Sequence, residues 1–367
     1  MTLATSSAFE LFLEKLRSPR FRVAAPLLVL AALRFFYHRQ RRHLEQIRLH
    51  RHFTQALADG HGEDKALDHR AVEEWHDVGE GVEFGSIVYL PKPNRPRSNV
   101  LVLIVPGNPG MAHFYLPLMR EIVRRHGTQH EVRAVTHAGH YMPWKNSGKV
   151  FDLEHQHEHK VTYLRQRFAE NPDLKLIIIG HSIGSYLTLK IVEAFPNQVA
   201  KIVLMQPTIH HIGRSAKGLQ LAPVFHHRQH SIKIVKLLEF LVPMALRRFL
   251  VRLAIGSHQE PVLHLASLAL VNRHVFNNVL HMADQEMKTV GDMNEQLLRE
   301  HEHKTLFVYS PIDGWVPNEF VQMFQLRLPR AGHRMVPQSH GFMMDDNGTR
   351  DMADHISQWI QDAMVTE

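Results

Sequence analysis

Short, mostly apolar runs alternate along the chain with segments whose apolar residues recur at helical spacing. The first run, Val100–Val105, reads VLVLIV, which is typical of a strand buried on both faces of a sheet. Similar runs follow at Val132–Thr136, Leu174–Ile179, Val199–Met205 and Thr305–Tyr309. Helical segments separate many of them, at Phe114–His126, Leu153–Phe168 and Ile183–Ala194. This alternation predicts an α/β fold with a mostly parallel sheet and helices on both faces.

A long helical insertion interrupts the alternation between residues 207 and 303. Within it, Ile232–Gly256 reads IKIVKLLEFLVPMALRRFLVRLAIG, so hydrophobic positions surround most of the helix and Pro243 divides it. We expect the insertion to form a helical cap. Two interpretations of its apolar part remain open: the residues are buried over the core, or some of them lie in a lipid surface.

The stretch Leu176–Phe195, LIIIGHSIGSYLTLKIVEAF, changes abruptly from a strand pattern to a helix pattern. At the change, Ser182 stands between Gly180 and Gly184 in the order G-H-S-I-G. This is the pattern of a nucleophile elbow, a turn so tight that both glycines must lack a Cβ. An ordinary strand-to-helix turn is the alternative, but the flanking strand and helix favour an elbow that projects the Ser182 hydroxyl above the sheet.

A serine hydroxyl is a poor nucleophile near neutral pH, so it needs a base to take its proton and an acid to orient that base. In α/β-hydrolases these follow the serine in the order Asp or Glu, then His. Because the chain has 30 histidines, position must select among them. Asp313 follows the apolar run Leu306–Tyr309, and His340 follows the short predicted strand Arg334–Val336. His333 is the rival base, but it falls at the start of that strand.

Such a serine also requires backbone N–H donors for the tetrahedral oxyanion. Ile183 supplies one, because it follows the serine at the start of a helix. The second should come from the turn PGNPG, directly after the first apolar run. Pro106 and Pro109 have no N–H group, which leaves Asn108 as the natural donor. A structural glycine turn is the alternative interpretation.

The 367 residues are 44% hydrophobic, which is enough for a large α/β domain with a sizeable core. The formal net charge of +7 is concentrated in residues 1–51, which hold ten Lys or Arg and three Glu. The remaining chain is therefore neutral. A phosphate-binding surface on the folded domain is not indicated, and we expect no nucleic-acid partner.

Residues 1–51 form a basic arm around the apolar segment Val23–Leu33, VAAPLLVLAAL. This segment is too short to span a bilayer, which needs about 20 residues. Pro26 within it suits a shallow or hairpin insertion, a monolayer anchor or an uncleaved targeting signal. A helix packed on the domain and a mitochondrial presequence are the alternatives. The polar, His-rich residues 52–83 are interpreted as a linker, and residues 84–363 as the main domain.

The absence of cysteine excludes disulfide bonds, a thiol nucleophile and a cysteine-based zinc site. In the histidine cluster HQHEH, His155 and His159 share one face of the predicted helix, but the sequence fixes no third metal ligand. The pairs at 210–211 and 226–227 indicate a metal still less. We therefore expect no metal and no cofactor, and interpret these histidines as a solvated face.

The segments IVPGNPGMAHFY, THAGH, IIGHSIGSY and SPIDGWVP, with a later S-H-G-F, occur in this order along the chain. Together they resemble the lipid-droplet-associated serine hydrolase family of the α/β-hydrolase superfamily. The resemblance covers roughly residues 84–363, and the combination of PGNPG with GHSIGSY is specific. It implies that Ser182, Asp313 and His340 match the family's catalytic triad, and that neutral lipid esters at lipid droplets are the setting. The N-terminal arm lies outside the match.

These observations predict a serine ester hydrolase that acts on a lipid ester, such as a sterol or acylglycerol ester, through an acyl-enzyme on Ser182. Its expected partner surface is a lipid droplet or membrane, on the cytosolic face of the droplet or the endoplasmic reticulum. Two alternatives remain open. An acyltransferase would use the same acyl-enzyme with another alcohol, and a droplet-organising protein would retain the triad with incidental turnover. A dehalogenase is excluded, because its chemistry needs a carboxylate at the elbow.

Overall fold

The computed structural model describes residues 19–59, 69–91, 98–142, 144–146, 148–256 and 260–364. The chain divides into two compact units, residues 1–50 and 51–367. Helix α2 (Pro19–Asp59) begins in the first unit and ends in the second. The apolar segment Val23–Leu33 of the expected arm lies within α2, but its side chains, like residues 1–18, are outside the described part. No described helix combines the length and apolar character needed to cross a membrane.

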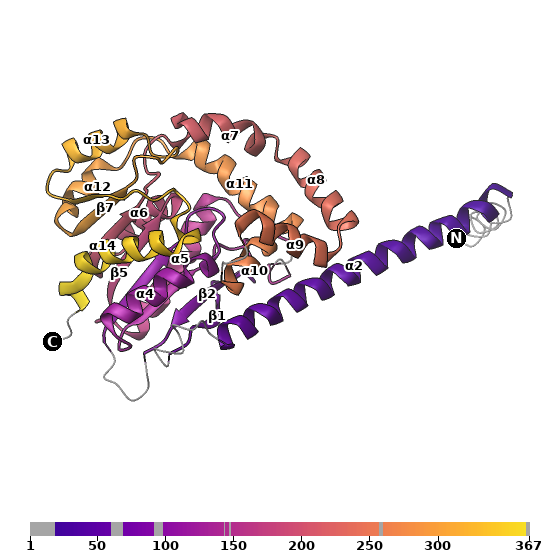
Figure 1. Ribbon diagram of the computed structural model, residues 1–367, viewed down its shortest axis with the longest axis horizontal. Helices are drawn as coiled ribbons and strands as arrows, with labels where there is room; N and C mark the ends of the chain where they lie inside the picture. The colour runs from indigo at the N-terminus through magenta and orange to yellow at the C-terminus, as the bar shows by residue number, and fades with distance from the viewer. Residues whose placement is uncertain are drawn as a thin grey trace, which may run out of the picture. The chain divides into compact units, whose positions relative to one another are not determined.

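The second unit is built on an eight-stranded sheet with the order β1-β2-β4-β3-β5-β6-β7-β8 (Figure 1). The pairs β1–β2 and β2–β4 are antiparallel, and the other pairs are parallel. The strands are β1 (Val72–Asp77), β2 (Glu83–Tyr89), β3 (Val100–Val105), β4 (Glu131–Val135), β5 (Lys175–His181), β6 (Val199–Met205), β7 (Thr305–Tyr309) and β8 (Gly332–Met335). The prediction of a mostly parallel sheet is confirmed.

Helices cover both faces of the sheet (Figure 1). On one face, α4 (Leu116–His126) packs against the terminal helix α14 (Asp346–Met364), and on the other α5 (Leu153–Glu170) packs against α6 (Ile183–Ala194). Helix α13 (Asn318–Arg327) connects β7 to β8. Every residue of β3 is buried, as its uninterrupted apolar sequence requires for a strand covered on both sides.

The prediction of a linker over residues 52–83 is wrong at both ends, where the structure has a helix and a strand. Residues 52–59 continue helix α2, and Val72–Asp77 form β1, the outermost strand of the sheet. The sequence of β1, VEEWHD, lacks an apolar run because an edge strand leaves one side open to water, where charged side chains are favourable. Residues 60–68 lie outside the described part of the chain.

The insertion between β6 and β7 is a cap of helices, as predicted. Its helices are α7 (Ala216–His226), α8 (Arg228–Leu241), α9 (Met244–Ile255), α10 (Pro261–Leu270), α11 (Arg273–Thr289) and α12 (Glu295–Glu300). Helix α11 packs against α7, α8 and α10, which places it at the centre of the cap (Figure 1).

Helices α8 and α9 expose most of their apolar side chains, and each buries one charged side chain. Leu237, Phe249 and Leu253 are 55%, 56% and 67% exposed, whereas Glu239 and Arg247 are buried. The buried Glu239 carboxylate accepts a hydrogen bond from a backbone N–H, and Arg247 Nε donates to a backbone carbonyl. A helix packed on a water-facing domain has the opposite arrangement. The interpretation that the cap buries this apolar surface over the core is therefore wrong for these two helices.

Candidate active site

Ser182 occupies a sharp turn between β5 and α6. Its backbone has φ 54° and ψ −125°, a conformation that a non-glycine residue rarely adopts and that is found where a site requires it. A Cβ on Gly180 would lie 2.5 Å from Thr188 Oγ1, and one on Gly184 would lie 2.1 Å from the carbonyl oxygen of Val105. Both positions therefore need glycine, which is the steric reason expected for an elbow.

The structure brings Ser182, His340 and Asp313 together at the carboxyl ends of three strands. His340 Nδ1 donates a hydrogen bond to Asp313 Oδ2 at 2.8 Å, and Ser182 Oγ lies 2.9 Å from His340 Nε2. Because the carboxylate can only accept, Nδ1 carries the proton and Nε2 is free to accept the serine proton. The Asp313 side chain is fully buried, and Oδ1 accepts a hydrogen bond from the amide of Trp315.

The rival base, His333, lies within β8 and does not contact the serine. Its Nε2 donates to the carbonyl of Leu328 at 2.9 Å, and Nδ1 accepts from the hydroxyl of Tyr309 at 3.0 Å. Both ring nitrogens of His333 thus form hydrogen bonds, one to Leu328 and one to Tyr309, and neither is available to the serine. His340 is the histidine that the fold places at the elbow.

The PGNPG turn lies directly against the elbow, since a Cβ on Gly107 would fall 2.8 Å from that of Ser182. The Gly107 amide donates to the Tyr115 hydroxyl at 2.9 Å, and the Gly110 amide donates to the Gly107 carbonyl at 2.7 Å. Neither the Asn108 amide nor that of Ile183 has an acceptor within the described residues. Asn108 and Ile183, expected from the sequence as oxyanion donors, thus have amides without a protein acceptor in this part of the chain.

Tyr115 and His181 connect the PGNPG turn to the loop of His340, and the sequence did not identify either residue. Tyr115 accepts from Gly107 and therefore donates its hydroxyl proton to His181 Nδ1, 2.7 Å away. Nε2 of His181 donates in turn to the carbonyl of His340 at 3.1 Å. Burial lowers the pKa of His181 well below its usual value, so the ring is neutral. Tyr115 belongs to the motif HFY and His181 to the motif GHSIG. Their place in these motifs was the signal that could have identified them.

The motif THAGH supports the other side of the same turn. Nε2 of His137 donates to the carbonyl of Pro106 at 3.1 Å, and Nδ1 of His140 donates to that of Pro109 at 2.8 Å. Burial lowers the pKa of His137 well below its usual value and that of His140 to about 4. Two neutral imidazoles therefore fix both proline carbonyls, leaving the turn rigid.

The histidine clusters have carboxylate partners of their own. In α5, Nδ1 of His155 contacts Asp152 at 2.7 Å. Among the described residues, His210, His211 and Asp292 form a group whose ligand atoms all lie within 4.8 Å of one another. The sequence could not join Asp292 to the histidine pair. His211 Nε2 lies 3.1 Å from the Asp292 carboxylate, and His210 Nδ1 accepts from the amide of Met293 at 3.3 Å.

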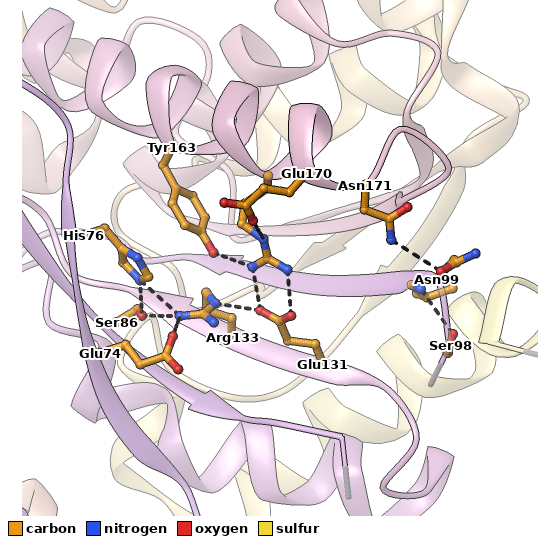
Figure 2. Close-up of polar contacts among 12 residues, drawn as sticks. Glu74, His76, Ser86, Ser98, Asn99, Glu131, Arg133, Tyr163, Glu170 and Asn171 are labelled. Carbon is orange, nitrogen blue, oxygen red and sulfur yellow. Dashed lines mark hydrogen bonds and ion pairs between the residues drawn. The ribbon is translucent and has the colours of Figure 1, made fainter. Parts of the chain in front are cut away.

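A second Ser–His contact lies in a polar cluster on β1, β2, β4 and α5 (Figure 2). Nε2 of His76 is 2.7 Å from Ser86 Oγ, but Ser86 is 1% exposed and also accepts from Arg133 at 2.6 Å. Glu131 accepts from Arg133 at 2.8 Å (Figure 2). It also accepts from Arg167 of α5 at 2.8 Å. This cluster is an ion-pair network that ties the antiparallel edge of the sheet to α5, and its serine cannot reach a substrate.

The chain is similar in sequence to a known protein family and to individual proteins of that family. The family described as lipid-droplet associated hydrolase matches residues 98–343. The "Lipid droplet-associated hydrolase" of Gallus gallus is 30% identical over 289 residues, 74% of this chain and 87% of the relative. The Homo sapiens protein of the same name is 27% identical, over 72% of this chain and 86% of the relative.

Solved structures with the same fold are more distant in sequence. A thermophilic esterase from Thermogutta terrifontis has a TM-score of 0.52 and 13% identity, covering 80% of this chain and 99% of the esterase. A serine hydrolase from Cycloclasticus zankles has a TM-score of 0.53 and 13% identity, covering 81% of this chain and 100% of the other. These similarities confirm the α/β-hydrolase fold.

Proposed function

The chain belongs to the lipid-droplet associated hydrolase family, and from this premise we propose that it is a serine ester hydrolase acting on lipid esters. The observation that carries the proposal is the hydrogen-bonded series Ser182, His340 and Asp313 beside two amides without acceptors among the described residues. A nucleophile, its base, an orienting acid and oxyanion donors are the groups that acyl transfer needs.

In the proposed reaction, Ser182 Oγ attacks the ester carbonyl carbon while Nε2 of His340 accepts the hydroxyl proton. The amides of Asn108 and Ile183 bind the oxyanion of the tetrahedral intermediate. The imidazolium then gives its proton to the leaving alcohol as the carbon–oxygen bond breaks, which leaves an acyl-enzyme. A water molecule attacks this ester with His340 as base, the carboxylic acid departs, and Ser182 regains its proton.

The outward apolar face of α8 and α9 supports a lipid surface as the place of reaction. The nine large side chains of this face are Ile234, Leu237, Leu238, Phe240, Leu241, Leu246, Phe249, Leu250 and Leu253. A continuous exposed patch of large apolar residues is rare on a protein that works only in water, and it marks a binding surface. In this proposal the face enters the acyl region of a monolayer while the charged residues stay at its polar boundary.

We place the protein on the cytosolic face of the lipid droplet or the endoplasmic reticulum. A droplet is bounded by a monolayer, into which short helices can insert without spanning it. The basic arm of residues 1–51 supplies a second contact in this proposal, since each Lys or Arg near an anionic surface contributes about 1 kcal/mol.

Hydrolysis of emulsified and soluble esters by full-length protein tests the proposal. The wild type should release carboxylic acid from an emulsified sterol or acylglycerol ester and from a soluble short-chain ester, and Ser182→Ala should release none from either. Formation of a new ester with an added alcohol, in place of acid, would favour the acyltransferase. A wild type that cleaves no ester would contradict the hydrolase and leave the droplet-organising protein.

A further inference from the structure

The side chain of Asn108 is held by the cap and not by the turn to which it belongs. Its amide Nδ2 donates to the carbonyl of Val279 at 2.9 Å and to Oε1 of Glu286 at 3.1 Å. A side-chain amide has two donor hydrogens, so both are used by helix α11. Asn108, which belongs to the turn beside the elbow, is therefore anchored through its side chain to a helix of the cap.

Helix α11 is itself fixed to the body of the domain beside this contact. Asn278 Oδ1 accepts a hydrogen bond from the amide of Phe151 at 3.0 Å, and Nδ2 donates to the carbonyl of Lys149 at 3.1 Å. Gly139 of the THAGH motif lies so close that a Cβ there would fall 2.5 Å from Asn278 Oδ1. Because α11 cannot shift easily at this point, its contacts with Asn108 are held in a defined place.

Glu286 is a buried carboxyl group that the proposed chemistry does not use. It is 4% exposed, and no ion pair to it occurs among the described residues. Burial raises the pKa of Glu286 to about 8, although the hydrogen bond from Asn108 acts in the opposite direction. A neutral carboxyl can accept the hydrogen bond from Asn108 without placing a negative charge near the oxyanion.

We propose that Glu286 is a positioning residue that, through the side chain of Asn108, fixes the backbone amide that binds the oxyanion. The cap helix α11 thereby contributes to stabilisation of the transition state. The inference rests on the proposed serine hydrolase function. It predicts a loss in kcat and little change in KM, because the oxyanion forms only after the substrate is bound.

Two substitutions separate the hydrogen bond from the space that the side chain fills. Glu286→Gln retains an acceptor oxygen, whereas Glu286→Met fills a similar volume and cannot accept. With a soluble short-chain ester, Glu286→Met should lower kcat roughly 10- to 100-fold, which is less than the loss in kcat when an oxyanion donor is deleted. KM should change less than about threefold. Glu286→Gln should stay within about threefold of the wild type. Thermal unfolding of each variant reports whether it is folded.

A matched control comes from the same helix. Asp284 is also mostly buried and ion-paired with Lys288, but it does not contact Asn108, so Asp284→Asn should leave kcat nearly unchanged. A double-mutant cycle then tests the route of the effect. If Glu286 acts through Asn108, Asn108→Ala combined with Glu286→Met should be no slower than Asn108→Ala alone.

The outcomes distinguish this inference from the function on which it rests. A wild type that neither cleaves esters nor reacts with a serine-directed phosphonate overturns the proposed function, and this inference with it. An active wild type with Glu286→Met equally active, or with single-mutant effects that multiply in the double mutant, overturns the inference alone. A raised KM with an unchanged kcat in Glu286→Met also contradicts the inference.

Discussion

Asp313 determines the tautomer of His340, because its carboxylate accepts the hydrogen bond from Nδ1–H. Asp313→Asn should leave the fold intact and lower kcat by several orders of magnitude, on the order of 10⁴ as in the well-studied serine protease triad. Steady-state hydrolysis of a soluble ester measures the effect. Asp345→Asn is the control, since Asp345 accepts from the Gly348 amide at the start of α14. If that variant lost as much activity as Asp313→Asn, the assignment of the acid would be wrong.

Ser182 and Asp313 could be proposed from the sequence because each follows a recognisable apolar strand, and His340 because it follows a short strand after the acid. Their supports could not, because each depends on a contact between distant segments. Tyr115 meets His181 across 66 positions, and Asn108 meets Glu286 across 178. In the sequence, Glu286 is one more polar residue of an amphipathic helix. Only the fold shows that it is buried against the oxyanion turn.

At the scale of elements, the strands and helices of the centre were predicted closely and those of the edge were not. β3, β6 and α6 have the bounds expected from sequence, because apolar residues dominate both strands and recur at helical spacing in α6. β1 was missed, because an edge strand tolerates charge. The sequence also could not predict which face of α8 and α9 is buried. Apolar residues surround most of each helix, so their spacing does not indicate one buried face.

The apolar face of α8 and α9 is expected to bind lipid. Replacing Leu237, Phe249 and Leu253 together with Gln should weaken binding to droplets about 100-fold, if each side chain contributes about 1 kcal/mol on insertion. Flotation with artificial droplets measures binding. Activity on a soluble ester should remain, because these side chains do not contact the triad.

Exposed apolar residues elsewhere provide the matched control for this prediction. Leu326 on α13 and Met335 on β8 are 81% and 48% exposed, and replacing them with Gln should leave flotation unchanged. Equal flotation of the wild type and the cap variant would refute lipid binding by this face.

At the scale of the whole molecule, buried neutral histidines should make the fold sensitive to acid. His137, His140 and His181 are 0% to 3% exposed, and burial lowers the pKa of each below the usual 6.5. The unfolded chain therefore binds protons below pH 6.5 that the native state does not, so stability is fully present above pH 6.5 and declines as the pH falls. Each such histidine should cost about 1 kcal/mol at pH 5.5.

Chemical unfolding of the full chain at pH 7.5 and pH 5.5 measures this loss. We expect these three rings to lower the free energy of unfolding at pH 5.5 by about 3 kcal/mol, set against the Glu286 carboxyl, whose raised pKa stabilises the native state as the pH falls. NMR chemical shifts of the three rings isolate their part, and rings that become protonated in the native state between pH 7.5 and pH 5.5 would contradict the prediction.

Covalent labelling determines whether Ser182 is an activated nucleophile. A fluorophosphonate reacts with a serine only when a base and an oxyanion site activate it, and it needs no knowledge of the natural substrate. Full-length wild type should gain one phosphonyl group, located on Ser182 by mass spectrometry of its peptides, and Ser182→Ala should gain none. A wild type that remains unlabelled, or a Ser182→Ala variant labelled to the same extent, would contradict the account.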